Sequence, residues 1–138
     1  MATVELRFSA LPEHVRTARL VAAAVARRAG VDESVLDEVR LAVGEACSRA
    51  VGLHQRGSGS GGAVRVALTD QEKRFLIEVG DGAGPLSDLI ASGGADESAD
   101  GSEDTLGLAV ITGLVEDLEV GRDDDGGVIR MSWPVAMA

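Results

Sequence analysis

Residues 32–52 read Asp-Glu-Ser-Val-Leu-Asp-Glu-Val-Arg-Leu-Ala-Val-Gly-Glu-Ala-Cys-Ser-Arg-Ala-Val-Gly, and this stretch predicts one long helix. Asp32 is suited to cap its N-terminus. Glu45 and Arg49 lie one helical turn apart, on a face beside the apolar one. Aliphatic and small residues recur at three- and four-residue spacings, which builds an apolar stripe that must face a core: Val35, Leu36, Val39, Ala42, Val43, Ala46, Ala50 and Val51.

Length and composition limit the number of domains and the classes of ligand. With 138 residues the chain is expected to form a single domain over residues 1–138. Only 2% of residues are aromatic, so stacking of nucleic-acid bases on rings is disfavoured. The formal net charge of −10 repels phosphate backbones and anionic membranes. We therefore expect neither direct nucleic-acid binding nor membrane binding.

The single cysteine and the N-terminus indicate where the protein works. Cys47 is the only cysteine, so no intramolecular disulfide can form. The first residues have no apolar signal core, and the apolar run at residues 20–26 is too short to span a bilayer. A cytoplasmic protein is expected.

A strand and a basic helix precede the central stretch. Residues 3–9 alternate apolar and polar side chains, as in a strand with one buried face. The next segment suits a helix that Ser9 could cap and that ends at Gly30. It carries four arginines in an otherwise acidic chain, and they form either a solvated face or a docking surface for an acidic partner: Arg16, Arg19, Arg27 and Arg28.

Two loops and a hairpin follow the central stretch. Residues 52–62 connect it to the next element, with residues 55–62 as a flexible connector. Residues 64–79 predict an antiparallel hairpin. Residues 86–105 are rich in Gly, Ser and acids and have no Lys or Arg. A loop of this length in a small domain is usually functional or disordered.

The C-terminal third completes the fold class. Residues 107–115 predict a helix, and residues 118–120 and 128–133 predict two strands joined by a turn. The order of elements is strand, helix, helix, two strands, loop, helix, two strands. It indicates an α+β fold: a two-layer α/β sandwich with a mixed, mostly antiparallel sheet and helices on one face.

Three features are candidate sites for binding or catalysis, although each also has a plain structural interpretation. Asp81 follows a strand and precedes glycines, as turn residues often do. Glu45 and Arg49 have the spacing of an ordinary surface pair. The helix start near Thr105 offers free N–H groups that can hold a phosphate. The two histidines are isolated in sequence, so a zinc site is not expected.

Taken together, these motifs resemble a known family. In order and spacing the chain resembles the GHKL (histidine-kinase-like, Bergerat-type) ATP-binding fold, and within it the small bacterial anti-sigma factors that are also serine kinases of anti-anti-sigma proteins. Residues 43–51 are similar to the N box, 77–85 to the first glycine box and 104–111 to the second. The loop at 86–105 falls at the ATP lid.

The resemblance implies roles for individual residues. Glu45 matches the general base that acts on the attacking serine hydroxyl. Asp81 matches the aspartate that accepts a hydrogen bond from the adenine amino group. Gly107 matches a glycine at which the backbone approaches the phosphates. Arg19 matches a first-helix arginine through which relatives hold the sigma factor, and Arg16 is grouped with it as partner-binding.

The chain also departs from the family pattern. Arg49 stands where the family has an asparagine that coordinates Mg²⁺, and a guanidinium has no acceptor for a metal. Gly82 and Gly84 are out of register in the first glycine box, and Thr105 replaces a glycine in the second. Arg49 either contacts the phosphates in place of the metal or, as we favour from the sequence, pairs with Glu45 and closes the site.

The sequence therefore predicts an anti-sigma factor with a degraded or atypical nucleotide site. It would sequester a sigma factor and be released by an anti-anti-sigma protein of the STAS type. ATP or ADP is the candidate cofactor, with Mg²⁺ disfavoured, and the resemblance implies a homodimer. The alternatives are an active ATP-dependent serine kinase of the anti-anti-sigma protein and a nucleotide-free interaction module for another regulator.

Overall fold

The computed structural model describes residues 2–56, 63–82, 111, 113–115, 117–123 and 126–135. Ile111, Gly113 and Leu114 are helical. No helix in these ranges is long and apolar enough to cross a membrane. The remaining elements are, in order, β1 (Ala2–Ser9), α1 (Pro12–Ala29), the 3₁₀ turn η1 (Glu33–Val35), α2 (Leu36–Arg56), β2 (Ala63–Asp70), β3 (Arg74–Gly80), β4 (Asp117–Asp123) and β5 (Gly126–Pro134).

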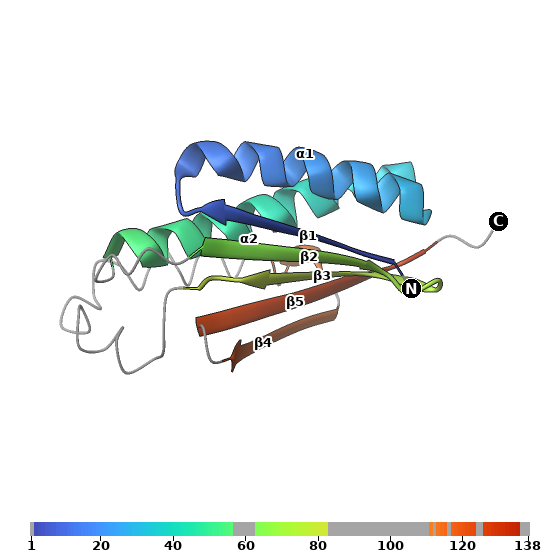
Figure 1. Cartoon of the computed structure of the whole chain (residues 1–138). Helices are drawn as coiled ribbons and strands as arrows, with labels where there is room; N and C mark the ends of the chain where they lie inside the picture. The colour runs from blue at the N-terminus through green and yellow to red at the C-terminus, as the bar shows by residue number, and fades with distance from the viewer. Residues whose placement is uncertain are drawn as a thin grey trace.

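The strands form one sheet in the order β1-β2-β3-β5-β4, and α1 and α2 lie on one face of it (Figure 1). This confirms the predicted α+β sandwich. All four strand pairings are antiparallel, so the expectation of a mixed sheet is wrong for the described strands. β4 runs in the same direction as β3, but β5 lies between them. No parallel neighbours therefore arise.

The core lies between the helices and the sheet. Every residue of the predicted stripe on α2 is buried except Val35, which is half-buried. Cys47 is fully buried within the same layer, and burial raises the pKa of its thiol to about 12. The sheet contributes the alternate residues that point at the helices: Val64, Val66, Leu68, Phe75, Ile77, Val79, Ile129, Met131 and Trp133.

Helix ends follow the sequence signals only in part. Gly30 closes α1 with a φ of 100°, as predicted. The Asp32 side chain accepts a hydrogen bond from the Ser34 N–H at 2.9 Å, but it caps the turn η1 that precedes α2. Ser9 does not cap α1, because Leu11 occupies the N-cap position. Ser9 contributes only its carbonyl, which accepts a hydrogen bond from the Leu11 N–H.

α2 is longer than predicted. It continues to Arg56, so residues 52–56 are helical and do not belong to the connector. Tertiary contacts at the end of this helix, described below, stabilise the additional turn. Residues 57–62, the acidic loop at 86–105 and most of the helix predicted over 107–115 lie outside the described residues.

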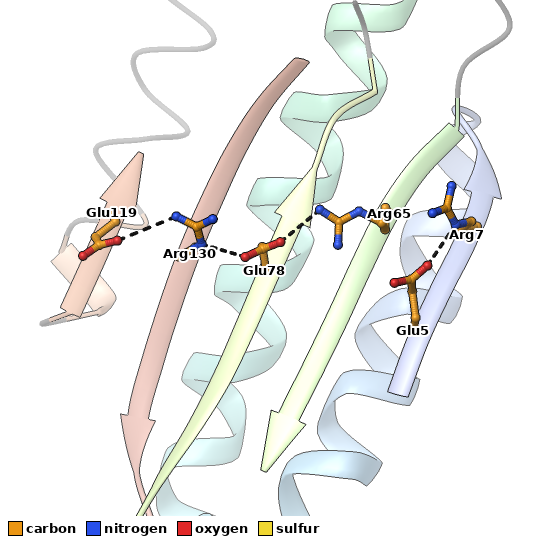
Figure 2. A network of polar contacts seen from close by, with 6 residues as sticks. All are labelled: Glu5, Arg7, Arg65, Glu78, Glu119 and Arg130. Carbon is orange, nitrogen blue, oxygen red and sulfur yellow. Dashed lines mark hydrogen bonds and ion pairs between the residues drawn. The ribbon is translucent and has the colours of Figure 1, made fainter. Parts of the chain in front are cut away.

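The helix-free face of the sheet carries a row of alternating charges (Figure 2). Glu78 on β3 lies between Arg65 on β2 and Arg130 on β5, with N···O distances of 2.9 and 2.6 Å. Arg130 also approaches Glu119 on β4 at 3.9 Å. Burial raises the pKa of Glu78, but hydrogen bonds from Arg130 and Arg65 more than offset this, so its pKa lies below the ordinary value of 4.5.

We predict that Glu78→Gln flattens the acid side of the stability profile. Because the pKa of Glu78 is lower in the folded than in the unfolded chain, its contribution is present above the unfolded pKa and is lost as the pH falls through the folded value. Urea unfolding from about pH 7 to about pH 3 should show less stability at neutral pH and a shallower decline in the variant.

Glu5→Gln is the matched control on the same face. Glu5 pairs with Arg7 at 2.9 Å, and both side chains are exposed. Loss of such a pair should change the free energy of unfolding by less than about 0.5 kcal/mol. Profiles of Glu78→Gln and the parent protein that run parallel would contradict the prediction.

Candidate functional site

Asp81 lies immediately after β3 and is only 3% exposed. Both of its carboxylate oxygens accept from the Gly127 N–H at 3.1 Å. The Asp81 N–H in turn donates to the Gly127 carbonyl at 3.0 Å. The carboxylate predicted to meet adenine thus joins the end of β3 to the start of β5.

α2 reaches the same point through His54. Nε2 of His54 lies within hydrogen-bond distance of the Asp81 carbonyl oxygen. Because a carbonyl only accepts, Nε2 carries the proton and donates. The sequence interpretation missed this contact by treating the histidine as isolated. The available signal was helical phase, since His54 follows the buried Ala50 and Val51 by one turn.

Two glycines shape the backbone around Asp81. Gly82 has a φ of 61°, and a Cβ there would lie 2.2 Å from the Ala63 carbonyl oxygen. A Cβ at Gly127 would lie 2.6 Å from Oδ2 of Asp81. Only glycine fits at either position without a shift of its neighbours. Gly82 is therefore required by the local backbone, although its register departs from the family pattern.

The two sides of α2 face different surroundings. On one side Gly44 meets α1, where an added Cβ would lie 2.9 Å from Cδ of Arg19. On the other, Glu38 and Leu114 line a groove of about 420 Å³. Glu45 and Arg49 follow Glu38 by seven and eleven residues, so helical periodicity places them on its side, away from α1.

Arg49 does not pair with Glu45. Both residues are half-buried, and neither forms an ion pair with another described residue. Nε of Arg49 is buried and has no hydrogen-bond partner. The pairing favoured from the sequence is therefore wrong. A pair at this spacing contributes only about 0.3–0.5 kcal/mol, so the packing of the side chain decides the geometry.

The first-helix arginines lie on the surface. Arg16 and Arg19 are both exposed, and neither joins an ion pair in the part of the chain that the structure describes. Arg27 on the same helix pairs with Glu33 at 3.4 Å. The other predicted site residues, Gly84, Thr105 and Gly107, lie outside the described ranges and stay predictions.

Comparison with known proteins identifies the family. The model of the histidine kinase-like ATPase domain matches residues 8–133. The chain belongs to this family. It is 31% identical over 139 residues to the serine-protein kinase RsbW of Bacillus pumilus (strain SAFR-032), a match that covers 94% of this chain and 83% of the relative. The predicted family is confirmed.

A second relative and a solved structure agree with this assignment. The serine-protein kinase RsbW of Halalkalibacterium halodurans is 27% identical over 145 residues, covering 94% of this chain and 82% of the relative. All of this chain aligns with the crystal structure of the RsbU and RsbW domains of Rv1364c from Mycobacterium tuberculosis, with a TM-score of 0.69 and 17% identity. The chain spans 34% of that protein. At this low identity the structural likeness supports the fold alone.

Within this ATPase fold we predict that Gly127→Ala destabilises the protein. The new methyl group meets Oδ2 of the buried Asp81 and displaces it from the Gly127 N–H. Overpacking of this kind costs about 1–3 kcal/mol, measurable as a loss in the free energy of unfolding by urea.

Gly121→Ala on β4 is the control. A Cβ at Gly121 meets nothing within 4 Å, so the change should stay within about 0.5 kcal/mol. Equal losses in the two alanine variants would show that the contact between Gly127 and Asp81 does not limit stability.

Proposed function

We propose that this protein is a cytoplasmic anti-sigma factor that sequesters a sigma factor and is released by an anti-anti-sigma protein of the STAS type. The similarity to two RsbW serine-protein kinases supports the class of protein. The observation that carries the proposal is the pair of exposed arginines on α1, Arg16 and Arg19, without ionic partners among the described residues.

Charge explains why these two arginines suit a partner surface. The chain has 23 acidic residues and 13 cations, so a surface arginine has many carboxylates available within the molecule. Arg19 instead lays its aliphatic stem over Gly44, and its charge stays at the surface. An acidic patch on a sigma factor would pair with such a cation and would be steered toward it.

The test is Arg19→Met, which keeps an aliphatic stem over Gly44 and removes the charge. We expect its affinity for the cognate sigma factor to fall at least about tenfold in calorimetric titration, as for loss of a charge-assisted hydrogen bond. Arg19→Ala should weaken binding in the same way, with a small additional loss of stability from the stem.

Arg27→Met is the matched control on the same helix. Arg27 is also exposed but is engaged by Glu33, so sigma-factor binding should not change. Unchanged affinity of Arg19→Met for every sigma factor of the host would overturn the proposal. Loss of affinity in both methionine variants would point to general electrostatics and not to a specific contact.

The second candidate function is an active serine kinase of the anti-anti-sigma protein. Glu45 favours it, because this carboxylate is half-buried and is not consumed by an ion pair with Arg49. A general base needs such a free carboxylate. Transfer of labelled phosphate from ATP to the anti-anti-sigma protein, abolished in Glu45→Gln, would establish it.

A further inference from the structure

Mg²⁺ does not fit the position at which this fold family coordinates it. Arg49 offers five N–H donors and no acceptor, so it cannot be a metal ligand. Nε of Arg49 is already buried without a hydrogen-bond partner. A divalent cation beside it would leave that donor unpaired and would add the repulsion of like charges. The guanidinium of Arg49 is complementary to an anion and not to a metal cation.

The position of Arg49 along α2 indicates which anion. The end of the helix is fixed at Asp81 through His54. Arg49 precedes His54 by five residues and Glu45 precedes it by nine, which are about 7.5 and about 13.5 Å of helix axis. Along the axis of α2 the order is thus the base acceptor, a cation and a carboxylate. A nucleotide bound with its base at Asp81 would extend its phosphates toward Arg49.

We propose that Arg49 binds the phosphates of a nucleoside di- or triphosphate directly and replaces the metal ion, so that the protein binds nucleotide without Mg²⁺. The proposal rests on the nucleotide site of the proposed function but not on sigma-factor binding. A guanidinium suits the task because its planar fork donates two parallel hydrogen bonds to phosphate oxygens.

In this arrangement the nucleotide binds as a ligand and is a poor phosphoryl donor. Metal ions neutralise the charge that develops on the phosphoryl group in transfer reactions, and one fixed arginine provides less charge than a divalent ion. Bound nucleotide would therefore not be rapidly transferred to a serine.

The experiment is calorimetric titration of the full chain with ADP in EDTA and again in excess Mg²⁺. The wild-type protein should bind equally in both buffers, within about threefold in Kd. Arg49→Asn restores an oxygen ligand and removes the cation. Its affinity should fall at least about tenfold in EDTA and recover in Mg²⁺.

Two further variants separate charge from folding. Arg49→Lys keeps a cation but loses the planar fork, so it should bind more weakly than wild type and still without Mg²⁺. Arg40→Asn is the matched control, because Arg40 is on the same helix, on its opposite side, and pairs with Asp37 at 2.6 Å. It should bind as wild type does. Thermal unfolding of each variant reports whether it is folded.

Three results would overturn the proposal. They are a requirement for Mg²⁺ in the wild-type protein, unchanged binding of Arg49→Asn in EDTA, and no ADP binding in either buffer. Sigma-factor binding measured on the same samples keeps the two proposals apart. A protein that binds its sigma factor but no ADP would retain the proposed function and refute the role of Arg49.

Discussion

The hydrogen bonds of Asp81 connect the three elements on which the candidate site depends. A carboxylate that is 3% exposed is costly unless its oxygens are hydrogen-bonded. The Gly127 N–H reaches both oxygens, and the Asp81 backbone bonds Gly127 and His54. β3, β5 and α2 are thereby held at one residue. The glycine at 127 follows from this arrangement, because any side chain there would occupy the space of the carboxylate.

A residue with this structural role is also well placed to recognise a ligand. The Gly127 N–H holds both carboxylate oxygens of Asp81. The contacts fix its orientation before any ligand arrives, and binding then costs less conformational entropy. Gly82 extends this rigid frame, because its backbone passes so close to the Ala63 carbonyl that no side chain fits between them. If Asp81 recognises the proposed nucleotide, stability and recognition depend on the same residue at the end of β3.

Local patterns in the sequence predicted most of the fold. The stripe on α2, the alternation in β2 and β3 and the end of α1 at Gly30 depend on neighbouring residues, and the structure confirms them. The buried face expected for β1 is only partly formed, because Val4 is exposed and Leu6 and Phe8 are half-buried. Contacts between distant residues were not predictable in this way. His54 lies 27 residues from Asp81, and Gly127 lies 46 residues from it. The mixed sheet was a wrong inference for the same reason, because strand order is a long-range property.

The expectations for the candidate site came mainly from the family resemblance. Position after a strand indicated only a turn residue at Asp81, and the family resemblance implied an acceptor for adenine; the side chain is buried, and its contact with adenine stays a prediction. The conformation of Arg49 was not determined by spacing, since an i, i+4 pair is weak enough for packing to override. Helical phase was the available signal that Gly44 lies on a different side of α2 from Glu45 and Arg49.

The arginines of this acidic chain divide according to what holds them. Arg65 and Arg130 neutralise Glu78, and they stabilise the helix-free face of the sheet. Arg19 and Arg49 are held instead by packing, the first by its stem over Gly44 and the second by burial of Nε. Their charges remain available although carboxylates are abundant. Since Arg19 lies on the α1 side of α2 and Arg49 on the other, the proposed protein partner and the proposed nucleotide would bind at separate surfaces. α2 lies between those two surfaces, and its last turn bonds Asp81.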